Sequence, residues 1–259
     1  MDLARRLLKD RSMASGIWAA ASGAVSQVAL LDTAANNLAN VDTNGFQPDR
    51  LVFRRVLQGA STGGEAHPSL EYAVGRTSAH QTRAGRAVPT GRDLDLALTG
   101  DGQYFPVQTA DGVRYTRAGS LQIAPDGALT MPGGPAYLNQ NHRPIVVPLG
   151  VGHVKIENTG ELSYDGRPSG ERIAVVQFHN PGALLKEGSV LLGAPPAAGP
   201  PLRVDVPYLQ TGALEKGTDQ AMKHMSTVVQ ASRDFEVLSQ VIQAFRDVEK
   251  SAARDISGS

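Results

Sequence analysis

The apolar residues near the start of the chain recur at helical spacing. Four positions seven residues apart are Ile17, Ala24, Leu31 and Leu38. With the Ala and Val residues beside them, they form one narrow stripe over about six helical turns. The turn-forming run Asp42-Thr43-Asn44-Gly45, followed by Pro48, predicts that this helix ends near Asn40. A helix, a tight turn and a shorter apolar segment therefore make up a first zone, residues 13–58.

The end of the chain carries a second and clearer helical pattern. One heptad position is occupied by Val228, Phe235 and Ile242, and another by Ala231, Leu238 and Phe245. Neither Pro nor Gly occurs from 218 to 255. Alternating spacings of three and four residues over this length are typical of a coiled-coil seam. We therefore expect residues 213–255 to form a long helix with one apolar seam.

Between these zones the sequence changes to short apolar runs separated by turns. Asp-Gly pairs, which favour tight hairpin turns, stand at 101–102, 111–112, 126–127 and 165–166. Residues 94–98 and 173–178 have the length and composition of strands. Residues 68–208 are therefore predicted to form an all-β, hairpin-rich domain. The Pro-rich stretch at 195–201 is expected to be a stiff connector.

The predicted fold class is α+β, with terminal helices packing as a coiled-coil-like bundle and a β-rich domain between them. Each terminal helix is apolar along one narrow stripe, which a small, turn-rich β domain does not cover unless the chain folds back. The natural partner of each helix is the other terminal helix, or the same helices in neighbouring copies. This arrangement indicates a protein that assembles.

Composition excludes several classes of function. The 25 Lys and Arg residues balance the 25 Asp and Glu residues, which removes the electrostatic argument for a nucleic-acid or anionic-membrane partner. Aromatic residues make up 5% of the chain, too few for a base-stacking platform. The absence of Cys excludes disulfides and thiolate metal sites. No segment approaches the ~18 consecutive apolar residues of a membrane span, so no direct membrane insertion is expected.

The N-terminus has two interpretations. The basic region of a signal peptide is suggested by Arg5, Arg6, Lys9 and Arg11. Polar Ser22 and Ser26 interrupt the Ala-rich stretch that follows, whereas the core of a signal peptide is uniformly apolar. The amphipathic stripe therefore favours a retained helix. A cleaved signal peptide, which would make the chain a periplasmic binding module, stays as the alternative.

The search for chemistry finds no catalytic, cofactor-binding or metal-binding motif. The six His residues are scattered, with no pair at helical ligand spacing. Gly100-Asp101-Gly102 begins like a dinucleotide-binding loop but lacks its third glycine. The strongest enzymatic candidate is the acidic set Asp93, Asp95 and Asp101, which could serve glycoside hydrolysis or bind Ca²⁺. We interpret Asp93 and Asp95 instead as the solvated face of a half-buried strand.

Several stretches stand out as motifs. The first is Ala35-Asn36-Asn37-Leu38-Ala39-Asn40, which runs into Val41-Asp42-Thr43-Asn44-Gly45-Phe46. Others lie at 93–105, 114–120, 126–129, 212–215 and 233–236. Together, and in this order, they resemble the motifs of flagellar basal-body rod and hook proteins. The resemblance touches every zone of the chain.

The resemblance implies a non-enzymatic structural subunit without cofactors. Such subunits are exported unfolded through the flagellar type III apparatus without a cleaved signal peptide. They polymerise helically, with themselves and with homologous rod and hook proteins, into the drive shaft that crosses the periplasm. Their terminal helices form the inner tube, and the β domain faces outward. The chain length favours a proximal over a distal rod position.

The sequence also departs from the family pattern. Gly-Thr-Asp at 217–219 stands where the family usually has Ser-Asn-Val, which puts contacts of that corner in doubt. Gln47-Pro48 replaces a Lys that is common after the Phe, and Met13 would be the more ordinary first residue.

The predicted assembly interface combines the two helical stripes with the Asn-rich turn. Its residues are Ile17, Ala24, Leu31, Asn36, Asn37, Leu38, Asn40, Asn44, Gly45, Phe46, Val228, Phe235, Leu238, Ile242 and Phe245. Trp18, the only Trp, is expected to be a packing anchor on the first helix. The alternative from another class is a secreted cell-envelope enzyme built on the β domain.

Overall fold

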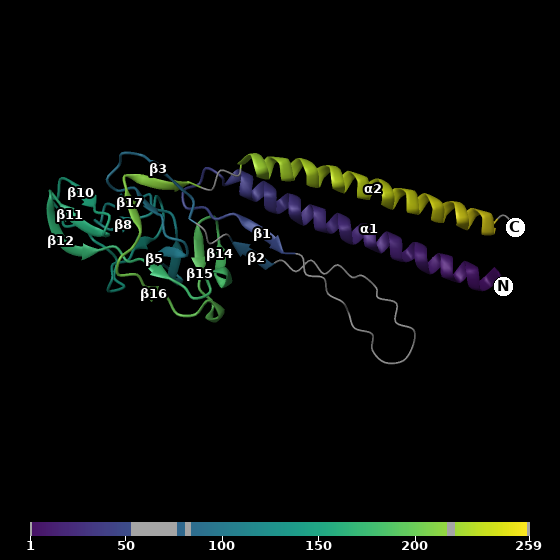
Figure 1. Ribbon diagram of the computed structural model, residues 1–259, viewed down its shortest axis with the longest axis horizontal. Coiled ribbons are helices and arrows are strands. Elements are labelled where there is room, and N and C mark those ends of the chain that lie inside the picture. The colour runs from purple at the N-terminus through teal and green to yellow at the C-terminus, as the bar shows by residue number, and fades with distance from the viewer. Residues whose placement is uncertain (1, 53–76, 81–83, 217–220, 258–259) are drawn as a thin grey trace. The chain divides into compact units, whose positions relative to one another are not determined.

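A computed structural model describes residues 2–52, 77–80, 84–216 and 221–257. The described residues fall into two compact units (Figure 1). Of the described residues, the helical unit contains 2–38, 50–52, 77–78 and 222–257, and the β unit contains 39–49, 79–80, 84–216 and 221. Helices and antiparallel strands occupy separate parts of the chain, so the predicted α+β class is confirmed.

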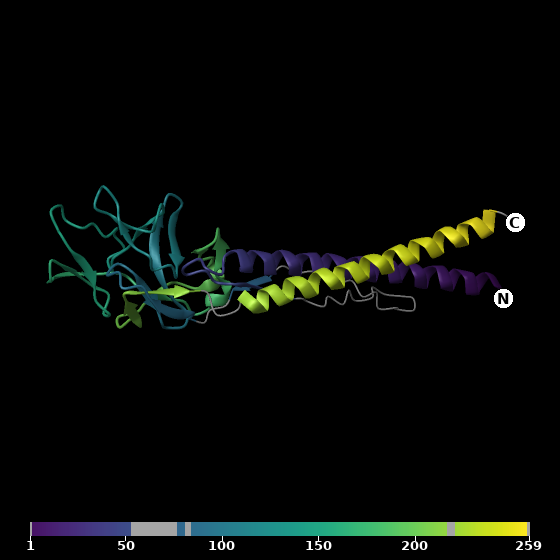
Figure 2. The ribbon, with the colours of Figure 1, turned by 90° about the horizontal axis from the view of Figure 1, so that it is seen from above.

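The helical unit is built from two long helices, α1 (Asp2–Ala39) and α2 (Ala221–Ser257). They lie side by side and run in opposite directions, with both chain termini at the same end of the pair (Figures 1 and 2). Helix α1 ends at Ala39, where the sequence predicts its end. Thr43 N–H then donates to Asn40 O at 3.0 Å, and Gly45 takes a φ of +71°, which begins the predicted turn.

The predicted start of the C-terminal helix at 213 is wrong. Ala213–Lys216 forms strand β18, which pairs with β3 (Arg86–Pro89), and helix α2 begins at Ala221. The helical pattern of α2 does not extend into these four residues, three of which are buried in the β unit. Parts of the predicted zones, residues 53–58, 68–76, 81–83 and 217–220, lie outside the described residues.

The β unit is centred on a nine-stranded antiparallel sheet. Its main path is β14 (Leu185–Glu187), β15 (Leu191–Gly193), β6 (Gly112–Thr116), β5 (Gln103–Thr109), β9 (Ala136–Tyr137), β8 (Leu129–Thr130) and β7 (Gln122–Ile123). A branch from β5 adds β13 (Val176–Gln177) and β16 (Leu202–Arg203). The long central strand β5 therefore pairs with β6, β9 and β13.

Smaller sheets complete the strand pairing. A three-stranded sheet contains β10 (Val154–Ile156), β11 (Glu161–Tyr164) and β12 (Arg167–Arg172). Two-stranded pairs join β17 (Leu209–Thr211) to β4 (Leu96–Leu98), β18 to β3, and β1 (Asp49–Val52) to β2 (Thr77–His80). Two short 3₁₀ helices are η1 (Pro181–Ala183) and η2 (Pro196–Ala198). The strands just before α2 therefore return to the first strands of the β unit.

The four Asp-Gly pairs lie in turns, as predicted. Their glycines all have positive φ, at Gly102, Gly112, Gly127 and Gly166. At the β11–β12 hairpin both Asp165 (φ +50°) and Gly166 (φ +77°) are left-handed, which matches the backbone of a two-residue hairpin turn. The turn chemistry read from the sequence therefore sets the hairpins of the β unit.

The apolar core lies within the β unit and has two buried clusters. The larger one contains Phe105 and Tyr137, whose rings meet edge to face at a centroid distance of 5.9 Å. The buried Tyr137 hydroxyl donates to Ala118 O at 2.7 Å, and burial raises the pKa of Tyr137. In the smaller cluster, Tyr115 and Phe178 make a second edge-to-face contact at 4.8 Å. Each aromatic ring therefore has a specific partner.

The interpretation of Asp93 and Asp95 as one solvated face is wrong for Asp95. Its side chain is 1% exposed, and its carboxylate accepts a hydrogen bond from Thr90 Oγ1 at 2.7 Å and lies 3.5 Å from the Arg92 guanidinium. Asp93 is half exposed and pairs with His153 Nε2 at 3.0 Å. The next residues, 96–98, are all buried, so the strand has no solvated face here. The backbone of Asp95 pairs with Ser120 and accepts from Gly212 N–H at 2.8 Å, so tertiary pairing has overridden the alternation of the sequence.

The close approach of two backbones at Gly119 gives a stability prediction. An added Cβ there would lie 1.8 Å from Leu96 O. The two backbones are already held together by the hydrogen bond that Leu96 N–H donates to Gly119 O at 2.8 Å. Gly119→Ala is therefore expected to lower the free energy of unfolding by about 3 kcal/mol, because the strands must separate. Urea denaturation followed by far-ultraviolet circular dichroism measures this. Gly182→Ala is the control, since its nearest neighbour would be 3.8 Å away, and a loss as large there would contradict the prediction.

Candidate assembly surfaces and their anchor

The two terminal helices contact each other through small residues. A Cβ added at Gly16 would lie 2.9 Å from the Phe245 ring, and one at Gly23 would lie 3.3 Å from Leu238 Cδ1. The buried residues of the helices are nearly all alanines: Ala20, Ala24 and Ala34 on α1, and Ala231 on α2. The absence of bulk lets the helices approach closely along this seam. The pair therefore buries one narrow stripe of each helix.

The predicted interface residues on the helices divide into two groups. Ala24 is buried, and Leu238 and Phe245 contact α1. The row formed by Val228, Phe235 and Ile242 is covered only in part, and Phe235 is 38% exposed. Intermediate burial also holds for Ile17, Leu31 and Leu38. Leu238 and Phe245 have the same intermediate burial as Val228 and Ile242, so both rows of α2 keep apolar surface in water, and Phe235 keeps the most.

Additional apolar side chains are exposed on both helices. Trp18, expected to be a packing anchor, is 76% exposed within this chain. Further exposed apolar residues are Val25 and Val28 on α1, and Met222, Met225, Val229, Val237, Val241 and Val248 on α2. Exposed apolar surface that continues along a helix pair is typical of a protein interaction surface. Neither of the helices has a stretch long and apolar enough to cross a membrane, among the residues described.

The Asn-rich turn after α1 belongs to the β unit and is docked on it. Gly45 N–H donates to Glu215 O at 3.0 Å, and a Cβ on Gly45 would lie 2.1 Å from Ala118 N. Glycine is required here for two reasons, the close approach of the Ala118 backbone and the positive φ. Phe46 is buried next to it. Of the predicted Asn residues, Asn37 is buried, Asn40 and Asn44 are half-buried, and Asn36 is exposed.

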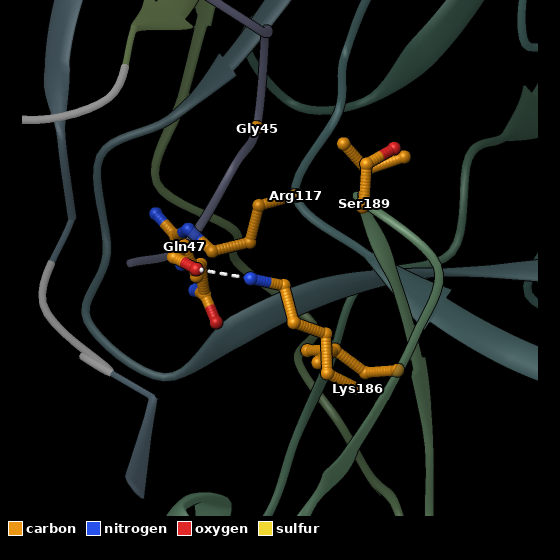
Figure 3. A pocket seen from close by; sticks show the side chains of 7 residues that line it. Gly45, Gln47, Arg117, Lys186 and Ser189 are labelled. Carbon is orange, nitrogen blue, oxygen red and sulfur yellow. Dashed lines mark hydrogen bonds between the residues drawn. The ribbon is translucent and has the colours of Figure 1, made fainter. Parts of the chain in front are cut away.

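Lys186 of β14 holds the turn from the other side (Figure 3). Its ammonium lies 4.0 Å from the centre of the Phe46 ring, a cation–π contact. Lys186 Nζ also donates to Gln47 O at 2.9 Å and lies 3.2 Å from Asp49 Oδ2. Burial lowers the pKa of Lys186, and the nearby Asp49 carboxylate opposes that change. One side chain therefore contacts Phe46, Gln47 and Asp49.

The cavity beside this turn is too small for an organic ligand. It measures about 10 Å³ and is lined by Gly45, Gln47, Arg117, Lys186, Ser189, Val190 and Leu192. A cavity of this size has room for about one water molecule, whereas ligand pockets measure hundreds of cubic ångströms. Among the described residues, no group of three His, Asp or Glu is arranged to hold a metal ion. The contact between this turn and the strands of the β unit is therefore a packing site.

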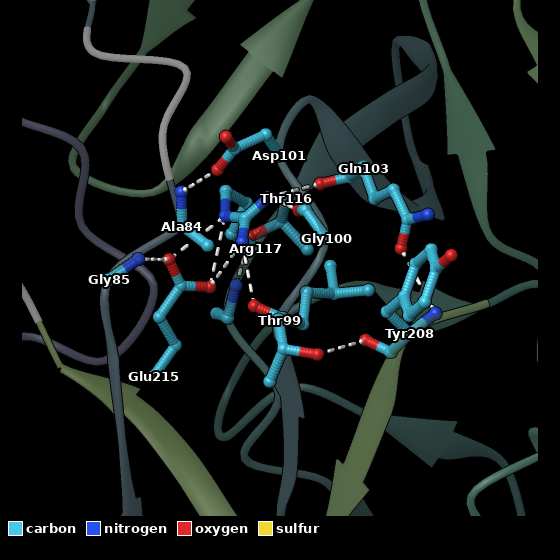
Figure 4. Close-up of polar contacts among 12 residues, drawn as sticks. Ala84, Gly85, Thr99, Gly100, Asp101, Gln103, Thr116, Arg117, Tyr208 and Glu215 are labelled. Atoms are coloured by element: carbon cyan, nitrogen blue, oxygen red, sulfur yellow. Dashed lines mark hydrogen bonds and ion pairs between the residues drawn. The ribbon is translucent and has the colours of Figure 1, made fainter.

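A buried ion pair, Arg117–Glu215, lies beneath the docked turn (Figure 4). Arg117 Nη2 lies 2.9 Å from Glu215 Oε2, and its Nε donates to both carboxylate oxygens. The remaining guanidinium donors reach the carbonyl oxygens of Leu98, Gly100 and Gln103. Glu215 also accepts from Gly85 N–H at 2.6 Å. Burial raises the pKa of Glu215, and Arg117 partly offsets that rise.

These contacts bring the two ends of the β unit to one point. Gly45 follows the last residue of α1 by six residues, and Glu215 precedes the first residue of α2 by six. The hydrogen bond between Gly45 N–H and Glu215 O joins the two segments directly. The segment that follows α1 and the strand that precedes α2 in the sequence are therefore joined within the β unit. We call Gly45, Arg117, Lys186 and Glu215 the anchor residues.

Sequence reasoning identified only Gly45 among the anchor residues. Arg117 and Glu215 do lie inside the motif stretches at 114–120 and 212–215. Both are charged residues within strand-like segments, and a charge that is buried in a strand requires a partner. This is the signal that could have identified them from the sequence. Lys186 carries no comparable signal, since nothing in the sequence around it indicates its partners.

The buried ion pair gives a second stability prediction. Glu215→Gln keeps the shape of the side chain but leaves the Arg117 charge buried without a counter-charge. We expect the free energy of unfolding to fall by about 3 kcal/mol, measured by urea denaturation. The matched control is Glu187→Gln, which breaks the solvent-exposed pair with Arg114 and is expected to lower the free energy of unfolding far less, because water screens that pair. Equal losses in the two variants would contradict the role of burial.

Comparisons with known proteins agree with this architecture. The family model described as flagella basal body rod protein matches residues 17–47, and that of the flagellar hook protein FlgE/F/G D1 domain matches residues 97–164. The flagellar basal-body rod protein FlgG of Bacillus subtilis is 33% identical over 254 residues, covering 90% of this chain and 94% of the relative. FlgF of Escherichia coli is 33% identical over 241 residues, covering 88% and 91%. The chain belongs to the family of flagellar basal-body rod proteins.

Proposed function

We propose that this protein is a non-enzymatic structural subunit of the flagellar basal-body rod. Its copies, together with homologous rod and hook proteins, polymerise helically through the terminal helices into the drive shaft for motility. The observation that carries this proposal is the apolar row of Val228, Phe235 and Ile242 on α2, which is only partly covered. The names of the relatives, which are basal-body rod proteins, support it.

The geometry of α2 explains why a further helix is required. Its seam has two rows, as in a coiled coil, and α1 contacts the row of Ala231, Leu238 and Phe245, of which Ala231 is buried. The row that contains Phe235 is left with apolar surface in water, which is unfavourable by about 25 cal/mol per Å². Helices of neighbouring subunits have the complementary stripes, so assembly removes this surface from water.

The location in the periplasmic rod, with export through the flagellar type III apparatus and no cleaved signal peptide, is part of the proposal. The lack of cleavage is supported by the Ala-rich stretch of α1, which packs against α2. Gly16 and Ala20 pack in the α1–α2 seam, so cleavage after that stretch would remove these contacts. The proximal axial position stays a prediction from chain length.

The partners of the acidic residues support a non-enzymatic role. Asp95 is buried against Thr90 and Arg92, and Asp101 Oδ1 accepts from Ala84 N–H at 2.7 Å. Asp93 pairs with His153 at the surface. Each carboxylate therefore has a structural partner within the β unit, and the envelope-enzyme alternative has no observation in its favour.

The assembly role of the uncovered row can be tested genetically. A strain lacking the gene is complemented with the intact gene, with Phe235→Asp or with Gln240→Asp, and its basal bodies are examined by electron microscopy. Phe235→Asp is expected to abolish motility and leave truncated rods, because it puts a charge into the interface. Gln240→Asp is the matched control, since it puts the same charge at an exposed polar position of α2.

The outcomes separate the alternatives. Rods of normal length with Phe235→Asp would refute the assembly role of this row. Normal flagella in the deletion strain itself would refute the need for this subunit in that organism. Circular dichroism of the purified Phe235→Asp protein, with unchanged helix content, excludes simple misfolding as the cause of lost rods.

The single Trp offers a spectroscopic prediction. Because Trp18 is the only Trp of the chain, intrinsic fluorescence excited at the indole band reports on that residue alone. Its high exposure predicts a red, water-like emission in the isolated subunit. On assembly we expect a blue shift and protection from an aqueous quencher, since large exposed aromatics become interface anchors. An unchanged spectrum in assembled rods would place Trp18 outside the interface.

A further inference from the structure

Helix α1 carries two glycines one heptad apart, and each faces a large side chain of α2. Gly16 faces the Phe245 ring, and Gly23 faces the end of Leu238. Phe245 and Leu238 are also one heptad apart, in the opposite direction. The two contacts therefore have the same antiparallel register. In each contact, a glycine of α1, which has no side chain, lies opposite a bulky side chain of α2.

Glycine in the middle of a helix needs a reason. Each one destabilises an exposed helix interior by about 1 kcal/mol relative to Ala. At Gly16, a Cβ would lie 2.9 Å from Phe245 Cζ, closer than carbon atoms pack, so the ring would have to move. At Gly23 the distance to Leu238 Cδ1 would be 3.3 Å, which also requires displacement. The glycines therefore create two notches that admit these side chains.

A slip of one heptad in either direction loses this match. In one direction Phe245 moves onto Gly23, and Leu238 comes opposite Leu30, so that two large side chains compete for one place. In the other direction Leu238 moves onto Gly16, and Phe245 loses any glycine opposite it. The observed register is the one in which both large side chains lie over glycines. A seam whose buried residues are mostly alanine has few other features that distinguish one register from the next.

We propose that Gly16 and Gly23 are register-determining residues for the α1–α2 pair. They select, by the shape of the two notches, the single alignment in which Phe245 and Leu238 fit. The alignment then determines the axial position at which the uncovered row of α2 lies relative to α1. This last consequence rests on the proposed function, in which the uncovered row is the surface that meets neighbouring subunits.

The register can be measured by disulfide formation, because the natural chain contains no Cys. In the full chain, Ala20→Cys is combined with Val241→Cys, two positions that lie midway between the notch contacts on their helices. The matched control combines Ala20→Cys with Val248→Cys, the same residue type one heptad away. Mild oxidation of dilute protein is followed by non-reducing electrophoresis, which separates cross-links within one chain from those between chains.

We expect the 20–241 pair to form an intramolecular disulfide and the 20–248 pair to stay reduced. Adding Gly16→Val and Gly23→Val is expected to slow the 20–241 cross-link by about tenfold, because overpacking opposes the native alignment. Adding Phe245→Ala and Leu238→Ala to those variants is expected to restore it, since the alanines make room for the new side chains.

Three results would overturn the proposal. One is equal cross-linking of the 20–241 and 20–248 pairs in the parent, or none in either. Another is an unchanged 20–241 rate after both glycines become Val. The last is cross-linking that occurs between chains only. None of these readouts depends on rod assembly, so their failure is distinct from failure of the proposed function, which the complementation experiment decides.

Discussion

A charge that is buried without water is costly, and Arg117 is fully buried in this protein. It is tolerated because Glu215 supplies a carboxylate and three backbone carbonyls accept its remaining protons. Glu215 in turn uses its own backbone carbonyl to hold Gly45. The first and last segments of the β unit are therefore joined through one pair of charges. If the pair is broken, the β unit loses the contact that supports the joining of these two segments.

The two units are stabilised by different physical means. The β unit has edge-to-face aromatic pairs, a buried ion pair and backbones packed at glycines, all of which specify one structure. The helix pair has an alanine seam that buries little area and leaves large side chains in water. Such a pair gains its full stability from further helices, which fits a subunit that completes its core only by assembly.

The sequence predicted the elements whose signal is local. The heptad spacing located both helices, the Asp-Gly pairs located the turns, and the motifs indicated the family. The start of α2 was misplaced because Ala213–Lys216 is a strand only through pairing with β3, far away in the sequence. Asp95 was misread because its backbone pairs with Ser120 and Gly212, which are distant in the sequence, and this pairing buries it. Lys186 was missed because its partners Phe46 and Asp49 become neighbours only in the folded chain.

The contact between Gly16 and Phe245 joins residues that are almost a whole chain length apart. A contact of such long sequence separation closes late, because the entropy of the intervening chain must first be lost. On the proposed export route the chain leaves a channel one end first, so the seam has to wait for the other end. The β unit can order most of its hairpins in the meantime. In the proposed assembly, the surface that meets other subunits therefore takes its final form only when the entire chain has arrived, which guards against assembly of incomplete subunits.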